Sequence, residues 1–312
     1  RSYYASMVYQ CVSGAIAERR LRPLADSHLY HSPNFIMPHF DGARVMTIHD
    51  LSTVRFPQFH RKQMVVLCEA GIHLAIEGKA HVITDSFHVR DELVNDFGVA
   101  GSRISTVHLA PDPRCRPRHE SECRHALDAL GLSHKAFFLS VGTIEPRKNL
   151  LRVFEAFMAG RRASHFDWPL IVVGASGWKS SREHEMLDEL TKDGLALYLD
   201  YVTDETLLTL YASAGALVFP SLYEGFGLPA LEAAACGCPV ITSEHSAMAE
   251  FAPEQTLFVN PEDVSSISDA MKAIPSRSES GSGFDVSTQA AARTWVDVAQ
   301  ETSDVYRAAL RG

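Results

Sequence analysis

Short apolar runs alternate with amphipathic stretches along most of the chain, and this alternation limits the fold more than any other feature. In the first half the runs are "ARVMTIH", "AHVITDS" and "RISTVHL", and stretches with helical spacing of apolar residues separate them. The longest of these stretches, residues 61–79, is expected to bury the side that carries Met64, Leu67, Cys68, Ile72 and Ala75. Strands that are apolar throughout are buried on both faces, and a connection long enough for a helix joins parallel strands. The sequence therefore predicts a parallel α/β sheet that is covered by helices on both faces.

The alternation is interrupted after residue 110 by "APDPRCRPRHESECR", which has no apolar period and is typical of an interdomain linker. A second series of strands is then expected at 136–142, 170–174, 196–201, 216–220, 239–243 and 256–259.

The 312 residues are enough for two separate cores. We expect two tandem Rossmann-like, doubly wound domains at 1–115 and 116–290, with a ligand cleft between them. A last helix within 291–312, with Trp295, Val298, Thr302 and Tyr306 at helical spacing on its apolar side, is expected to pack back toward the first domain. The glycine- and serine-rich segment 276–287 is expected to form a mobile loop.

Composition excludes several classes of protein. The formal net charge is −9, with 29 Lys and Arg against 38 Asp and Glu, so the basic footprint of a nucleic-acid-binding protein is missing. No apolar run approaches the roughly 20 residues that cross a bilayer. Six scattered cysteines favour reduced thiols and a cytoplasmic protein. The basic stretch "ERRLR" leaves peripheral contact with the inner face of a membrane open, and a solvated helix end is the alternative.

The stretch "FPSLYEGFGLPALEAAACGCPVITS" places two glutamates around a glycine-rich turn. A helix is expected to begin near Leu228, with Glu224 in the turn before it and Glu232 about one turn inside. Gly225 and Gly227 let the backbone approach a ligand closely, and the N–H groups at the helix start favour an anion. A phosphate repels a carboxylate beside it, so the partners of such a carboxylate should be hydroxyls. We predict that Glu232 binds the hydroxyls of a ribose and that Glu224 binds hydroxyls of a sugar. The alternative is an ordinary helix glutamate after a glycine turn.

A basic pair, Arg147 and Lys148, lies in "SVGTIEPRKNLLRVFEAF" directly before a helix with Asn149 at its predicted N-cap. Cations at the amino-terminal end of a helix interact unfavourably with its dipole unless an anion lies beside them. The placement suggests a diphosphate, and a solvated basic pair on a loop is the alternative.

Other strand ends carry weaker signals. His49 follows the strand in "RVMTIHDLS", where a structural loop histidine is the alternative to a functional one, and His31 lies at a similar strand end. Tyr201 and Val202 end a strand of the second domain and are candidates for contact with a nucleobase. The sequence has no aspartate pair spaced for a metal-bound diphosphate, no phosphate-binding loop and no dinucleotide fingerprint. We therefore expect neither a metal nor a cofactor.

The motifs "HSPNF", "TIHDLS", "GTIEPRKNL", "GASGWK", "FPSLYEGFGLPALE" and "CGCPVITS" occur in this order over nearly the whole chain. In them the sequence resembles the retaining, nucleotide-sugar-dependent glycosyltransferases of family 4, which have two Rossmann-like domains (the GT-B class). It is most similar to the bacterial branch that makes mannosyl or rhamnosyl linkages in surface polysaccharides. Relatives usually begin with a further strand and a glycine-rich loop, so the resemblance implies a truncated amino-terminal domain.

The resemblance also implies roles for individual residues. Arg147 and Lys148 would hold the donor diphosphate, and His49 would line the sugar pocket from the first domain. Thr143 stands where many relatives carry an arginine. The donor itself would be held by Glu232 at the ribose, by Glu224 and the backbone of Gly225, Phe226, Gly227 and Leu228 at the sugar, and by Thr143, Tyr201 and Val202 nearby.

The resemblance thus implies a retaining transferase that moves a hexose, mannose or deoxymannose, from a nucleoside diphosphate sugar, with GDP the favoured nucleotide. The acceptor would be a saccharide or a lipid-linked saccharide in surface polysaccharide synthesis. Two alternatives remain open at this point: a non-catalytic sugar-nucleotide-binding protein, and an epimerase or phosphorylase with the same two domains.

Overall fold

The computed structural model describes residues 19–38, 40–253, 256–279 and 292–311. Contacts divide the chain into two units. The first comprises residues up to His108 together with the carboxy-terminal stretch from Val296, and the second comprises Leu109–Trp295. The predicted domain limits at 115 and 290 lie a few residues from these.

Six parallel strands form the sheet of the second unit, in the order β10-β9-β8-β5-β6-β7. The strands are β5 (Phe138–Val141), β6 (Leu170–Val173), β7 (Ala196–Leu199), β8 (Ala216–Phe219), β9 (Val240–Ser243) and β10 (Leu257–Val259). The helices are α5 (Glu120–Leu130), α6 (Leu150–Arg162), α7 (Ser181–Lys192), α8 (Asp204–Ser213), α9 (Leu228–Ala235) and α10 (Val264–Glu279), with 3-10 turns η4 (Pro146–Lys148) and η5 (Ala247–Glu250). All six predicted strands are found.

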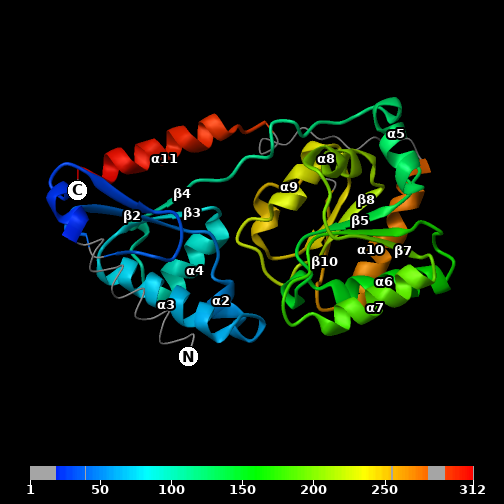
Figure 1. The fold of residues 1–312 in the computed structure, drawn as a ribbon, viewed down its shortest axis with the longest axis horizontal. Helices are drawn as coiled ribbons and strands as arrows, with labels where there is room; N and C mark the ends of the chain where they lie inside the picture. The colour runs from blue at the N-terminus through cyan, green and yellow to red at the C-terminus, as the bar shows by residue number, and fades with distance from the viewer. Residues whose placement is uncertain (1–18, 39, 254–255, 280–291, 312) are drawn as a thin grey trace. The chain divides into compact units, whose positions relative to one another are not determined.

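Each face of this sheet has its own apolar core. Figure 1 shows helices on both faces of the sheet, with α8 and α9 on one and α6 and α7 on the other. Neighbouring residues of one strand point to opposite faces, so Leu139 belongs to the core beneath α5, α8 and α9, while Phe138 belongs to the core beneath α6, α7 and α10. All four residues of β6 and all four of β8 are buried, which explains why these strands are apolar throughout. The predicted doubly wound α/β class is confirmed for this unit.

The first unit holds a parallel sheet in the order β1-β2-β3-β4. Its strands are β1 (Leu29–Ser32), β2 (Ala43–Ile48), β3 (His81–Thr84) and β4 (Ile104–Thr106). Its helices are α2 (Ser52–Arg55), α3 (Lys62–Glu77), α4 (Phe87–Phe97) and α11 (Trp295–Ala309), with 3-10 turns η1 (Arg22–Leu24), η2 (Pro57–Phe59) and η3 (Gly101–Arg103). Figure 1 shows α11 along one side of this sheet and α3 on the other.

Two residues predicted on buried helix faces are exposed, and one predicted loop overlaps a helix. Met64 was predicted on the buried side of α3 but is 48% exposed, because burial in this helix begins only at Cys68. Trp295 was predicted on the apolar side of α11 and is 46% exposed. The predicted loop 276–287 overlaps the end of α10, and its residues 280–287 lie outside the described part of the chain.

Asn149 connects three loops of the second unit in a way the sequence did not suggest. It occupies the N-cap position of α6, but its backbone is left-handed (φ 62°) and its side chain makes no capping hydrogen bond. Instead Nδ2 donates to the carbonyls of Pro220 (2.9 Å) and Pro261 (2.6 Å), and Oδ1 accepts from Arg152 (2.9 Å). The side chain therefore joins the loop after β5 to the segments that follow β8 and β10.

Replacing Asn149 is expected to destabilise the second unit in two separable steps. Asn149→Gly keeps the left-handed backbone but leaves the two proline carbonyls without this donor, so the free energy of unfolding should fall by about 2 kcal/mol. Asn149→Ala adds the strain of a Cβ in the left-handed region and should cost about 1 kcal/mol more. Urea unfolding followed by circular dichroism measures both.

Ser164→Gly is the matched control, because Ser164 is also left-handed (φ 56°) near the other end of α6 and its side chain is exposed. It should leave stability unchanged or slightly raised. If Asn149→Gly proved as stable as the parent, the side-chain bonds would not hold the three loops together.

Candidate functional site

The candidate site of the second unit lies where the order of the strands reverses. β5 has β6 on one side and β8 on the other, and the helices that follow β5 and β8 cover opposite faces of the sheet. The two connecting loops therefore diverge at the carboxyl edge and leave room for a ligand, as in other open α/β sheets. One loop carries Arg147 and Lys148, and the other carries Glu224.

Arg147 holds the two loops together. Its Nη1 donates to the Tyr223 carbonyl (2.9 Å) and to Glu224 Oε2 (3.0 Å), and its Nη2 donates to Glu145 Oε1 (2.6 Å). The Leu222 N–H also donates to the Arg147 carbonyl (2.9 Å). Both terminal nitrogens of the guanidinium are thus engaged by the protein itself, which gives Arg147 a positioning role that the sequence did not reveal.

Lys148 contacts the same carboxylate from the other side. Its Nζ lies 2.6 Å from Glu224 Oε1 and 4.8 Å from the centre of the Phe219 ring. Its stem passes Gly142, where a Cβ would lie 3.4 Å from Lys148 Cε, and the φ of +141° there suits glycine. The ammonium is therefore held at the carboxyl ends of β5 and β8.

Glu224 is buried between these two cations. Burial alone would raise the pKa of its carboxyl, but the charges of Lys148 and Arg147 outweigh burial, and the pKa of Glu224 is lowered. Glu145 is buried as well and is paired with Arg147. The cluster of Glu145, Arg147, Lys148 and Glu224 thus carries two positive and two negative groups.

The glycine turn leads into α9, which begins at Leu228 as predicted. Gly227 has a φ of +99°, and a Cβ there would lie 2.5 Å from Met248, so both backbone and space require glycine. Phe226 is buried in the core with its ring centre 4.7 Å from that of Phe251. Only the backbone of Phe226 is therefore left for the predicted sugar contact.

Glu232 has surroundings opposite to those of Glu224. Burial raises the pKa of the Glu232 carboxyl, and the negative charges of Asp112 and Asp204 raise it further. The buried Tyr211 hydroxyl approaches Glu232 and lowers its pKa somewhat, although this contact falls short of full hydrogen-bond geometry. The pKa of Glu224 is thus lowered and that of Glu232 is raised, although both belong to one motif. Such opposite shifts are a feature of sites in which two carboxyl groups have different roles.

The remaining predicted contacts of this unit lie at or just beyond strand ends. Thr143 follows β5 by two residues and is half-buried. Tyr201 and Val202 follow β7, and Tyr201 is 85% exposed. No hydrogen bond joins these three side chains to the glutamates among the residues that the structure describes, so their contact with a base or sugar stays a prediction.

His49 of the first unit is held by two acceptors. Its Nδ1 lies 2.7 Å from Asp85 Oδ2 and its Nε2 lies 3.0 Å from the Pro33 carbonyl. Since a carbonyl and a carboxylate only accept, both ring nitrogens must carry protons for both bonds to form. The hydrogen bond to Asp85 raises the pKa of His49 in spite of burial, and burial raises the pKa of Asp85.

His31, at the end of β1, is linked to α11. Its Nε2 lies 2.9 Å from Thr47 Oγ1 and its Nδ1 lies 2.7 Å from the Tyr306 hydroxyl. Burial lowers the pKa of His31, and the neighbouring His49 lowers it further. The sequence interpretation missed Glu145, Asp85 and Tyr306 as partners of site residues. Asp85 and Tyr306 are far in the chain from the histidines they contact, and the two-residue spacing of Glu145 and Arg147 does not by itself show a buried pair.

Within residues 19–38, 40–253, 256–279 and 292–311, no three His, Cys, Asp or Glu side chains are grouped so that they could hold a metal ion. No helix in the described part of the chain is both long and apolar enough for a membrane span.

Residues 128–282 match the family described as Glycosyl transferases group 1. O-antigen chain mannosyltransferase B of Escherichia coli is 36% identical over 241 residues, which are 77% of this chain and 63% of that protein. O-antigen chain mannosyltransferase RfbU of Salmonella typhimurium is 28% identical over 233 residues, which are 74% of this chain and 60% of that protein. The chain thus matches about three fifths of the length of these curated relatives.

Solved structures share the fold. Sucrose-phosphate synthase from Thermosynechococcus elongatus superposes with a TM-score of 0.71 at 21% identity, covering 89% of this chain and 73% of that one. WaaG, a glycosyltransferase involved in lipopolysaccharide biosynthesis, superposes with a TM-score of 0.62 at 17% identity, covering 89% and 76%. The predicted class of two Rossmann-like α/β domains is confirmed.

The His49–Asp85 pair predicts a specific pH dependence. A folded-state pKa above the usual value means that the stability contributed by His49 is fully present below about pH 6.5 and is lost as the pH rises through the raised pKa. Nuclear magnetic resonance titration of the ring protons should place the His49 midpoint above that of a free histidine and the His31 midpoint below it.

Asp85→Asn removes the charge and leaves His49 half-buried, so its midpoint should fall to the usual value or lower. His49→Gln identifies the resonance. A His49 midpoint that does not move in Asp85→Asn would mean that the carboxylate does not hold the proton on the ring.

Proposed function

Because residues 128–282 belong to the group 1 glycosyl transferases, we propose that this chain transfers a hexose from a nucleoside diphosphate sugar to a saccharide or lipid-linked acceptor. Mannose or deoxymannose is the proposed sugar and GDP the proposed nucleotide. The names of the two O-antigen mannosyltransferases support mannose and a role in surface polysaccharide synthesis. The proposed location is the cytoplasm, with acceptors reached at the membrane surface.

The observation that carries the proposal is the shared Glu224 carboxylate at the strand-order reversal. Lys148 and Arg147 approach it from the loop after β5, at 2.6 and 3.0 Å. The carboxyl edge of the sheet is where α/β proteins bind nucleotides. Here the cations of one loop lie beside a carboxylate of the adjacent loop. A diphosphate and a sugar hydroxyl are the two ligand groups that match this pair.

Donor binding would exchange partners within the cluster. The diphosphate of the donor would take the place of Glu224 at Lys148 Nζ, because a doubly charged anion competes well with one carboxylate. Glu224 would then be free to accept hydrogen bonds from hydroxyls of the donor sugar. Arg147 would keep the glycine turn in place through its bonds to Glu145 and the Tyr223 carbonyl.

Negative charge grows on the leaving diphosphate as the bond to the sugar breaks. Lys148 is positioned to stabilise this charge, and the backbone N–H groups at the start of α9 add to it. For a retaining reaction the acceptor hydroxyl would attack from the face that the diphosphate leaves, with a donor phosphate oxygen as its base. Electrostatic stabilisation by these groups would remove the need for a metal ion.

Glu232 is proposed to bind the paired hydroxyls of the donor ribose. Its carboxyl lies near other acidic groups, and hydroxyls are neutral donors that add no charge to this region. The contact would be the same in the ground state and the transition state, so it would contribute to affinity rather than to turnover.

Product formation tests the proposed function directly. The full chain should transfer mannose from GDP-mannose to a mannose-terminated saccharide in excess chelator, with the product detected by mass spectrometry. UDP-glucose and ADP-glucose serve as matched donors and should give less product. Donor binding in a thermal-shift assay without any product would support a binding protein instead. Activity that is lost in chelator and restored by Mg²⁺ would contradict the metal-free mechanism.

Two substitutions should separate the roles of the charged residues. Lys148→Ala should lower kcat at least about ten-fold, which corresponds to roughly 1.4 kcal/mol of transition-state stabilisation, and weaken binding of the free diphosphate nucleotide. Glu232→Gln should raise KM for the donor with a smaller effect on kcat. Lys192→Ala, an exposed lysine at the end of α7, should leave both constants unchanged.

A 2′-deoxyribose donor completes this test. An enzyme that already lacks the ribose contact has less to lose from a missing hydroxyl, so Glu232→Gln should discriminate less against the deoxy donor than the parent does. Equal discrimination by both enzymes would mean that Glu232 is only a helix residue.

A further inference from the structure

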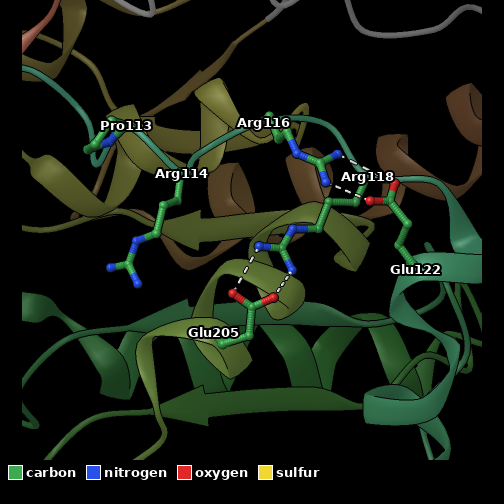
Figure 2. Close-up of a pocket in the computed structure, with 6 residues that line it drawn as sticks. All are labelled: Pro113, Arg114, Arg116, Arg118, Glu122 and Glu205. Atoms are coloured by element: carbon green, nitrogen blue, oxygen red, sulfur yellow. Dashed lines mark hydrogen bonds and ion pairs between the residues drawn. The ribbon is translucent and has the colours of Figure 1, made fainter.

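The chain passes between the two units at two places, ahead of α5 and at the start of α11. Residues 112–118 follow the first passage and are fixed to the second unit by ion pairs. Arg118 lies 2.5 Å from Glu205 of α8, and Figure 2 shows this pair beside a pocket of about 430 Å³. Arg116 lies 2.6 Å from Glu122 of α5 in the same figure. The first passage is thus anchored on framework helices and not on predicted site residues.

The second passage leads into α11, which is anchored on the sheet of the first unit. Within this helix, all of which the structure describes, only Val298 and Val305 are buried. So small an apolar contact leaves an important part of the docking to polar groups. The Tyr306 hydroxyl lies 2.7 Å from His31 Nδ1, and the two ring centres are 5.4 Å apart. The second passage is therefore tied to the carboxyl end of β1.

His31 links the end of β1 to the neighbouring strand. Its Nε2 lies 2.9 Å from Thr47 Oγ1 on β2, which pairs with β1. Two positions after these residues come Pro33 and His49, and they are in contact as well: His49 Nε2 donates to the Pro33 carbonyl (3.0 Å). Two successive contacts thus join the end of β1 to the end of β2, one beside α11 and the other at a predicted site residue.

The turn that contains the proline carbonyl is compact. Its buried Ser32 hydroxyl donates to the Ile36 carbonyl (2.7 Å). A Cβ at Gly71 would lie 1.8 Å from the Phe35 carbonyl oxygen, so the turn lies directly on α3. A turn with an internal hydrogen bond and a closely packed neighbour cannot bend freely. A displacement at one of the two contacts is therefore passed to the other.

We propose that Tyr306 is a positioning residue for His49. Its hydroxyl fixes His31, the turn after His31 places the Pro33 carbonyl, and this carbonyl holds the His49 ring opposite Asp85. The His49 side chain is 48% exposed, so a ligand can still reach the ring. The effect on sugar transfer rests on the function proposed above, whereas the effect on the ring can be measured without a substrate.

Tyr306→Phe tests the proposal, because it removes only the hydroxyl. We expect the His49 ring resonances to shift and their titration midpoint to fall by up to about 0.5 pH unit, since a loosened Pro33 carbonyl stabilises the charged ring less. The fall should be smaller than in Asp85→Asn, which removes the stronger of the two partners. Nuclear magnetic resonance titration of the folded full chain measures both.

Tyr30→Phe is the matched control, because it removes the same hydroxyl from the neighbouring residue of β1, whose ring lies 5.9 Å from that of Phe40. It should leave the His49 resonances unchanged. His31→Ala removes the intermediate contact and should lower the His49 midpoint as Tyr306→Phe does. Adding Tyr306→Phe to His31→Ala should cause no further shift, because both substitutions break the same link.

Sugar transfer is the second measurement, with GDP-mannose as the donor. Tyr306→Phe should lower kcat several-fold and change the KM for the donor less, because a ring that can rotate is less often in the productive orientation. Tyr30→Phe should leave both constants unchanged.

Three results would overturn the proposal: His49 resonances and midpoint in Tyr306→Phe equal to those of the parent, an equal shift in Tyr30→Phe, or an unchanged kcat in a Tyr306→Phe chain whose His49 ring has shifted. A parent chain that transfers no sugar would contradict the proposed function instead. The resonances would then still decide whether Tyr306 positions His49.

Discussion

The Glu224 carboxylate, shared between Lys148 and Arg147, is the interaction on which the second unit depends. It joins a loop after β5 to a loop after β8, strands that are neighbours only because the order of the sheet reverses between them. A buried carboxylate is unfavourable unless cations meet it, and two cations in one small loop repel each other unless an anion lies between them. The carboxylate and the two cations therefore stabilise one another. An anionic ligand would have to compete with Glu224 for these cations.

Arg147 and Lys148 are adjacent in sequence but differ in what a ligand could gain from them. The flat guanidinium of Arg147 meets a carbonyl and two carboxylates, a geometry that a lysine could not reproduce. The Lys148 ammonium is a single point charge on a flexible stem and can change partner with little rearrangement. The first residue thus fits a framework role, and the second fits a role that changes during a reaction cycle.

The apolar pattern was sufficient to predict the strands of the second unit, because each is a short and mainly apolar run between polar turns. The same pattern did not predict burial correctly at helix ends. Met64 has the spacing of a core residue, yet it lies in the first turn of α3 and is exposed. The glutamates, the basic pair and His49 were selected from their residue type at strand ends, and their roles stay predictions. Asp85 and the left-handed Asn149 could not be recognised in this way, since their partners lie far away in the chain. Glu145 pairs with Arg147 only two positions away, but its residue type and spacing alone do not show that the pair is buried.

The hydrogen bond between His31 and Tyr306 spans 275 positions of sequence and belongs to a unit whose two parts are separated by the whole of the other. On a ribosome, nearly all of Leu109–Trp295 is synthesised before the helix that carries Tyr306. The strands of the first unit are thus made well before α11, and this side of their sheet stays uncovered until α11 has also been synthesised. The order of synthesis, and not only the native contacts, therefore exposes the first sheet to chaperones and to misassociation.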